Sequence, residues 1–268
     1  MQNSSMAYRS KREPQVWTAY AATIVAALAW TLLGAGPTSA AEVIDHSAGF
    51  GNHSDLTANG SATFVGTDAE VTDGGFGEAG SIFSNDAVHI VKFNSTFTFS
   101  IVPGTSPMAD GMTLTIQSSG PTALGPSGGG LGYGPDSPGG SPGIIKSVAI
   151  KFDIFDFGTG EGNDSSGVFS GGRSPTVSQA GGDILIGLKG TGIDLNSQDL
   201  MEGLISYQGG NLTVTLTDTT TGASFSKTVS VDIPLAVGGD TANVGFTGGT
   251  GGLSAVQAIH TWTFRGGK

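Results

Sequence analysis

The sequence predicts an all-β protein built as a sandwich or jelly roll, and three observations support this class. Short segments alternate between apolar and polar residues, as in "FTFSIV", "LTVTLT" and "VSVDI". Turn pairs such as Thr-Gly, Gly-Gly, Asp-Gly and Pro-Gly separate these segments. Glycine accounts for 46 of the 268 residues, and beyond the N-terminal segment no long stretch keeps the apolar period of a helix without interruption.

The N-terminal segment, residues 1–41, is typical of an export signal. Three basic residues lie within positions 9–12, followed by the apolar run "VWTAYAATIVAALAWTLLGAG" and the small residues of "PTSAAE". We expect cleavage after Ala40 or Ala41. The alternative is an uncleaved anchor, because the run is about long enough to span a bilayer. We predict a secreted protein with no membrane attachment apart from this segment, and a single domain over residues 42–268.

The charge of the mature chain argues against nucleic acid as a partner. Residues 42–268 keep 8 basic and 21 acidic side chains, a net charge of −13. So few scattered cations cannot form the basic surface that a polyanion requires. The chain also has no cysteine, so an exported form must be stabilised by its core and not by disulfides.

Each alternating segment predicts a strand with one buried face. The residues expected on the buried faces are, in chain order, Phe97, Phe99 and Ile101; Leu212, Val214 and Leu216; Val229, Val231 and Ile233; and His260, Trp262 and Phe264. Between "MTLTIQ" and "SVAIKFDIF" lies the low-complexity stretch 121–143, which reads either as a linker between two domains or as a long loop. Strand-like sequence on both sides favours the loop.

The segment "SVAIKFDIF" predicts a strand between the core and a functional site. Its alternation separates an apolar row from a row that contains charged residues: Val148, Ile150, Phe152 and Ile154 against Lys151, Asp153 and Phe155. The charged row faces either a site or plain solvent. A second carboxylate, Asp110 in "MADGMTLTI", lies between two small residues at the start of another strand, where a surface turn is the simplest interpretation.

From residue 43 to residue 265 the order of motifs resembles that of the legume-type (L-type) lectins, especially their bacterial secreted relatives. The motifs are "GSATFVGTDAEVTDGGFGEAGSIFSNDAVHIVKFNSTFTF", "ADGMTLTI", "GGGLGYG", "VAIKFDIF" and "VGFTGGTGGLSAVQAIHTWTF". The resemblance implies a concanavalin A-like jelly-roll β-sandwich, with a flat back sheet, a curved front sheet and a sugar site on loops above the front sheet.

The resemblance also implies which residues bind the sugar. Asp110 would follow a cis peptide and accept hydrogen bonds from two sugar hydroxyls, with the strength of a charged acceptor. Backbone N–H donors would come from Gly129 or Gly130, and from Gly251 and Gly252 in "TGGTGGLSA", because glycine lets a ligand approach the backbone. Phe157 would stack on a sugar face or belong to the core. Tyr133 is a second stacking candidate.

The metal site of the family is altered in this chain. Its glutamate, aspartate, asparagine, later aspartate and histidine positions correspond here to Lys151, Asp153, Phe157, Asp164 and the neighbourhood of Phe169. Loss of the glutamate and histidine argues against a transition metal. We infer that the Lys151 amine replaces the ion and pairs with Asp153. For calcium the sequence allows two interpretations. Oxygens of Asp153, the Phe155 carbonyl, Asp156 and Asp164 could bind the ion, or "GTGEGND" could be a solvated acidic turn.

The resulting prediction is a secreted, non-catalytic lectin that binds glycans or polysaccharide and forms a homodimer through its flat sheet. One alternative is a structural or adhesive domain with a degenerate sugar site. Another is a glycoside hydrolase, which requires two carboxylates about 5–5.5 Å apart in retaining enzymes, yet the candidate strand contains no glutamate. The stretch "GFGEAG" matches a dinucleotide-binding pattern but lacks the helix that this pattern requires.

Overall fold

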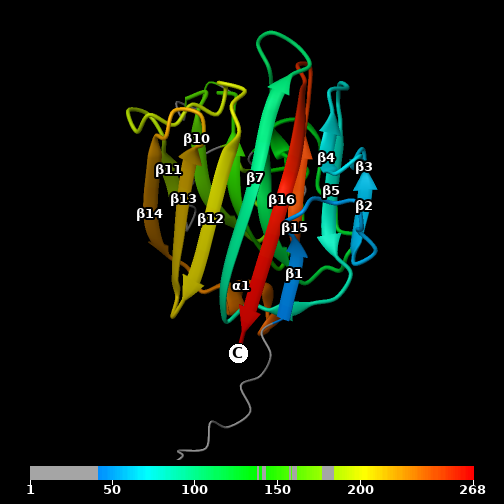
Figure 1. Cartoon of the computed structure of the whole chain (residues 1–268), viewed down its shortest axis with the longest axis vertical. Helices are drawn as coiled ribbons and strands as arrows, with labels where there is room; N and C mark the ends of the chain where they lie inside the picture. Colours follow the sequence, from blue (N-terminus) through cyan, green and yellow to red (C-terminus); the bar gives the residue numbers. More distant parts are fainter. Residues whose placement is uncertain (1–41, 138, 141–142, 157, 159–161, 177–183) are drawn as a thin grey trace, which may run out of the picture. The chain divides into compact units, whose positions relative to one another are not determined.

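Antiparallel strands form the two sheets of a sandwich in this protein (Figure 1). The computed structural model describes residues 42–137, 139–140, 143–156, 158, 162–176 and 184–268, all within one unit of the chain. The predicted signal segment and Phe157 lie outside the described residues. Within the described part of the chain, no helix has the length and apolar character needed to cross a membrane.

We call the two sheets the back sheet and the front sheet, and each has eight strands among the described residues. The back sheet runs in the spatial order β14 (Ser224–Ser230), β13 (Asn211–Asp218), β12 (Met201–Gln208), β7 (Lys92–Pro103), β16 (Ala255–Gly267), β4 (Asp68–Asp73) and β3 (Thr63–Val65), with β1 (Glu42–His46) also paired to β16. The front sheet runs in the order β11 (Ile184–Gly187), β10 (Ser165–Ser170), β9 (Ser147–Asp153), β8 (Gly111–Gln117), β15 (Thr241–Gly249), β5 (Ala79–Ser84) and β2 (Leu56–Gly60), with β6 (Val88–His89) also paired to β15.

The main hydrophobic core lies between the two sheets. The predicted inner faces of β7 and β13 are buried in it, which confirms the alternation in those segments. Phe97 of β7 crosses the interface, because its ring centroid lies 5.7 Å from that of Phe152 on β9 and 5.1 Å from that of Phe246 on β15, both edge to face. Such pairs stabilise a core beyond the burial of their apolar area.

The front sheet is also covered on its other face. A second apolar cluster there joins Phe83, Ala149 and Phe169 of the sheet to Tyr133 and Ile144 of the segment between β8 and β9. That segment is therefore a loop, as predicted, since β8 and β9 pair directly, with Gly111 opposite Asp153. Every residue of β9 is buried for the same reason.

The prediction fails in different ways at Ile233 and His260. Ile233 is buried in the core as predicted, but it begins the short helix α1 (Ile233–Val237) and does not continue a strand, because the Asp232 side chain accepts the N–H of Leu235 and caps the helix. His260 lies at a shift of register in β16, between Ile259 and Thr261. This irregularity turns His260 away from the core, and its ring nitrogens contact Ser100 and Asp68.

Candidate functional site

The fold places Asp110 between the central strands of the front sheet. Asp110 immediately precedes β8, whose first residue, Gly111, lies opposite Asp153 of β9 and Gly249 of β15. The Asp110 N–H donates to the Gly249 carbonyl (3.2 Å), and the Asp110 carbonyl accepts the N–H of Ile154 (3.0 Å). The peptide between Ala109 and Asp110 is cis, as the resemblance implied. Both neighbouring strands therefore fix the backbone from which this carboxylate projects.

The Asp110 side chain is buried without a complete set of hydrogen-bond donors. It is 3% exposed, and its Oδ2 atom has no hydrogen-bond partner. Burial, together with the negative charges of Asp153 and Asp136, raises the pKa of Asp110 from 3.8 to about 7. A buried oxygen of this kind favours a ligand that brings donors, such as hydroxyl groups.

Glycines from two loops leave room around this carboxylate. A Cβ atom on Gly251 would lie 3.3 Å from Asp110 Oδ2 and 3.5 Å from the Gly128 Cα. The Gly128 N–H donates to the Thr250 carbonyl (2.9 Å), which joins the loop between β8 and β9 to the turn between β15 and β16. The glycine brought against Gly251 is thus one position before the predicted pair, Gly129 and Gly130. Those two complete the turn η1 (Gly128–Gly130) and are buried. The prediction that Gly130 and Gly251 offer free N–H donors is wrong, because the first donates to the Ser127 carbonyl (3.3 Å) and the second to the Leu253 carbonyl (3.1 Å).

The remaining predicted sugar-contact residues have different outcomes. Gly252 is exposed, and no other atom would lie within 4 Å of a Cβ built on it. The stacking hypothesis for Tyr133 is wrong, because this side chain is fully buried and its hydroxyl accepts hydrogen bonds from Ser147 Oγ (3.0 Å) and the Gly172 N–H (3.2 Å). Phe157 lies outside the described residues, so its role stays a prediction.

Next to Asp110, Lys151 and Asp153 form a fully buried ion pair. The Lys151 Nζ atom donates to Asp153 Oδ2 (3.0 Å), and both side chains are 0% exposed. The same ammonium donates to the Pro175 carbonyl (2.7 Å) and lies 5.4 Å from the centroid of the Phe169 ring. The predicted pairing is confirmed, and the alternative of a solvent-facing pair is wrong.

The other candidate calcium ligands bind protein donors. Asp164 Oδ1 accepts the N–H of Leu195 (2.9 Å) and the side-chain amide of Asn196 (3.1 Å), and burial raises the pKa of Asp164. Asp156 Oδ1 accepts the N–H of Gly158 (2.8 Å) in a local turn. These contacts shape the bend after β9 into a hydrogen-bonded loop.

The described members of the proposed ligand set do not fit a calcium ion. The described residues contain no group of three or more histidine, cysteine, aspartate or glutamate side chains that could hold a metal. Asp153, the first residue of the proposed ligand set, already contacts the Lys151 ammonium through Oδ2 and the Phe155 N–H through Oδ1 (3.0 Å). A dication bound there would be repelled by an ammonium at close range.

Comparison with known proteins identifies the family. A model of the legume lectin domain matches residues 49–268. The chain belongs to the legume lectin domain family. Its sandwich is similar to that of the lectin from Bauhinia forficata in complex with GalNAc, with 22% identity, a TM-score of 0.69 and coverage of 84% of this chain and 98% of that one.

Two further structures show the same fold. The metal-free form of lectin I-B4 from Griffonia simplicifolia has 19% identity and a TM-score of 0.69, with coverage of 83% of this chain and 98% of that one. Arcelin-5, a lectin-like defence protein from Phaseolus vulgaris, has 17% identity and a TM-score of 0.66, with coverage of 85% and 98%. At these identities the likeness establishes the jelly-roll sandwich alone.

Sequence reasoning missed three contributors to the site of this legume lectin domain. Asp136, in the low-complexity loop, lies 3.0 Å through Oδ1 from a Cβ built on Gly128 and adds negative charge near Asp110. Gly128 itself and Asn196, which binds Asp164, were also missed. Gly128 begins the motif "GGGLGYG", so its loop was located although the residue was not chosen. The polar turn "DLNSQD" gave a local signal for Asn196, but nothing in it pointed to Asp164.

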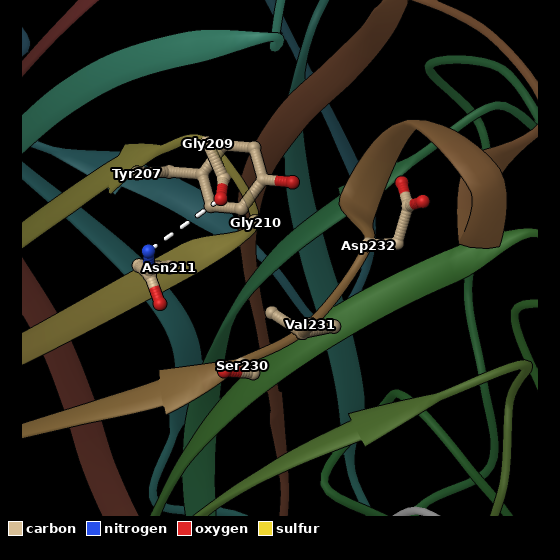
Figure 2. Close-up of a pocket in the computed structure, with 7 residues that line it drawn as sticks. All are labelled: Tyr207, Gly209, Gly210, Asn211, Ser230, Val231 and Asp232. Carbon is tan, nitrogen blue, oxygen red and sulfur yellow. Dashed lines mark hydrogen bonds between the residues drawn. The ribbon is translucent and has the colours of Figure 1, made fainter.

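A separate depression lies at the opposite end of the sandwich, between the β12–β13 turn and the start of α1 (Figure 2). Its polar groups contact one another or the nearby backbone: the Tyr207 hydroxyl accepts the Ile233 N–H (3.2 Å), and the Asn211 amide donates to the Gly209 carbonyl (3.5 Å). Asp232 caps α1. These groups serve the local fold, in contrast to Asp110, so we place the candidate site of this legume lectin domain at Asp110.

Proposed function

We propose that this legume lectin domain binds neutral sugars without catalysis, with Asp110 as the central acceptor. The supporting observation is the buried Asp110 Oδ2 atom without a hydrogen-bond partner beside Gly251 and Gly128. Two sugar hydroxyls would donate to the ionised carboxylate, and hydrogen bonds to a charged acceptor are about twice as strong as neutral ones. The glycine loops, Gly128–Gly130 and Gly251–Gly252, place no side chain against the sugar ring. The N–H groups of Gly128, Gly130 and Gly251 already donate to backbone carbonyls, so we assign them no hydrogen bond to the sugar.

The charges around the site favour neutral sugars over acidic ones. Asp136 and Asp153 already raise the pKa of Asp110, and the chain from residue 42 on has a net charge of −13. A carboxylated sugar would be repelled. The complex of the Bauhinia forficata lectin with GalNAc supports a pyranoside of this neutral kind as the ligand.

The contacts of Asp153 support binding and not hydrolysis. A glycosidase needs a second carboxylate free to act as nucleophile or base. Here the Asp153 oxygens accept hydrogen bonds from Lys151 Nζ and from the Phe155 N–H. Asp110 would thus act without a catalytic partner in Asp153, the nearest carboxylate on the adjacent strand.

We further infer that Lys151 takes the place of a metal ion in this domain. Its ammonium neutralises Asp153 and ties β9 to the Pro175 carbonyl, so that the bend beside the sugar site is held without calcium. Sugar binding would then be independent of calcium. Chelator should change neither the affinity for sugar nor the midpoint of thermal unfolding.

The test is titration calorimetry with methyl glycosides of galactose, N-acetylgalactosamine, glucose and mannose, with and without EDTA. Asp110→Asn should weaken binding about 10- to 100-fold, because one hydrogen bond to a charged group contributes about 1.5–3 kcal/mol. Asp86→Asn, at an exposed carboxylate away from the site, is the matched control. Binding that survives Asp110→Asn would remove this residue from the site. No binding to any glycan would favour a structural or adhesive domain.

The proposal includes export and self-association. The basic and apolar order of residues 1–41 supports secretion, as in the bacterial secreted relatives that the sequence resembles, and N-terminal sequencing of the mature protein should begin after Ala40 or Ala41. A homodimer through the back sheet is supported by its hydroxyl-rich outer face, where Thr98 pairs with Thr261 (2.7 Å) and Thr213 with Thr228 (2.8 Å). Light scattering would measure its mass.

A further inference from the structure

Phe76 is a large apolar side chain exposed beside the proposed sugar site. It lies at the tip of the turn Gly74–Glu78, which joins β4 to β5, and 67% of its surface is exposed. Single exposed apolar residues are common on protein surfaces, so exposure alone assigns no role. The position of this one is unusual because its turn is fixed to the loop that borders Asp110.

Four hydrogen bonds join the Phe76 turn to the β15–β16 loop. The Gly77 N–H donates to the Gly251 carbonyl (3.0 Å), and the Thr250 N–H donates to the Glu78 carbonyl (3.0 Å). The buried Thr250 hydroxyl accepts the Glu78 N–H (2.9 Å) and donates to the Gly75 carbonyl (2.8 Å). These bonds hold the residues on both sides of Phe76, so that its backbone position is set by the sugar-binding loop.

Two glycines link the Phe76 turn to Asp110. Gly77, next to Phe76, contacts Gly251, and Gly251 is the residue whose missing Cβ leaves space 3.3 Å from Asp110 Oδ2. No other atom would lie within 4 Å of a Cβ built on Gly77 or on Gly252. Gly77, Gly251 and Gly252 therefore place no side chain on the link between the Phe76 turn and Asp110.

We propose that Phe76 forms an apolar subsite that binds the group attached to the Asp110-bound sugar, and this inference rests on the proposed function. The group is either an aryl aglycone or the C–H face of a second pyranose ring. Both present a flat apolar surface to an aromatic side chain, and Phe has no polar atom that would require a hydrogen bond. Asp73 precedes the turn and Glu78 is its last residue, and both negative charges disfavour an acidic group.

The test compares methyl glycosides, phenyl glycosides and methyl glycosides of disaccharides, each with galactose, N-acetylgalactosamine, glucose or mannose as the terminal sugar. The full chain and its Phe76→Ala variant are titrated by calorimetry. For the sugar that binds, we expect the phenyl glycoside, the disaccharide or both to bind more tightly than the methyl glycoside. Phe76→Ala should weaken binding of the phenyl glycoside or disaccharide that gained affinity by about 2- to 12-fold. Binding of the methyl glycoside should stay unchanged.

A matched control and a conservative variant separate this effect from general surface changes. Leu235, on α1 at the far end of the sandwich, is 77% exposed, and Leu235→Ala should change no affinity. Phe76→Trp should still bind the phenyl glycoside or the disaccharide more tightly than the methyl glycoside. Higher affinity for the phenyl glycoside alone, relative to the methyl glycoside, identifies an aglycone subsite. Higher affinity for the disaccharide as well identifies a sugar subsite. Equal binding of all three ligand types, or a preference that survives Phe76→Ala, overturns the subsite alone. No binding of any ligand overturns the proposed function as well.

Discussion

The ionisation of Asp110 should destabilise the folded protein, and Asp110→Asn should remove this effect. The side chain is 3% exposed and its pKa in the folded state is raised to about 7 from 3.8, chiefly by burial. The folded state therefore binds a proton that the unfolded state has released between these two pH values. Because the folded pKa is the raised one, the associated stability is complete below pH 3.8 and is lost as the pH rises through 7.

The magnitude follows from the two pKa values. At about 1.36 kcal/mol per pH unit, the full difference between 3.8 and 7 corresponds to about 4 kcal/mol. About 3 kcal/mol of this is lost between pH 5 and pH 8.5, where the measurement is practical. Asparagine has nearly the same shape as aspartate and does not titrate, so the variant should gain stability relative to the wild type as the pH rises.

Urea unfolding at pH 5 and pH 8.5 provides the assay, with the fluorescence of the buried Trp262 as the signal. Other carboxylates with raised pKa values, such as Glu70 and Asp164, titrate in both proteins and cancel in the comparison. The wild type should lose about 3 kcal/mol more than Asp110→Asn over this interval. Parallel pH profiles for the two proteins would show that Asp110 ionises freely in the folded state and would refute the reasoning.

Three other perturbations test the same structure. Sugar affinity should fall about tenfold for each pH unit below 7, because protonation of Asp110 competes with binding, and calorimetry at pH 5, 6 and 7 measures the slope. Lys151→Met should lower the free energy of unfolding by about 3–5 kcal/mol, since it leaves the buried Asp153 without its cation, and a change below 1 kcal/mol in urea titrations would contradict the buried pair. Gly245→Ala should prevent soluble folding, because its Cβ would lie 1.9 Å from the Ile82 carbonyl, whereas Gly187→Ala, with open space around it, should be tolerated in the same expression test.

Period-two alternation was sufficient to predict most of the core but failed where a strand is irregular. The inner residues of β7 and β13 follow the pleat without interruption, so every second residue is buried. In β16 the shift of register at His260 reverses this order, and the local sequence "AIHTWTF" gives no sign of it. At Ile233 a local signal was present, since Asp232 followed by a proline two residues later is typical of a helix start.

The candidate site was predictable where it depends on one strand and not where it depends on contacts between loops. Lys151 and Asp153 are two residues apart along β9, which placed them on one face of the strand, and the structure confirms that they pair. The approach of Gly128 to Gly251 joins residues more than a hundred positions apart, and its register follows from the path of a long loop with no period of its own. The family resemblance located that loop, although one residue too late.

The different surroundings of Asp110 and Asp153 account for the different roles that we propose for them. Both carboxylates lie at the same end of two paired strands, and both are buried. Asp153 has an ammonium at 3.0 Å, whereas Asp110 has an oxygen without a partner. Asp153 nevertheless raises the pKa of Asp110, even with the Lys151 ammonium at 3.0 Å from it. In the proposed sugar site, removal of the Lys151 charge would leave Asp153 without its counterion and should raise the pKa of Asp110 further. The lysine would in this way help to keep Asp110 ionised, and able to accept hydroxyl groups, near pH 7.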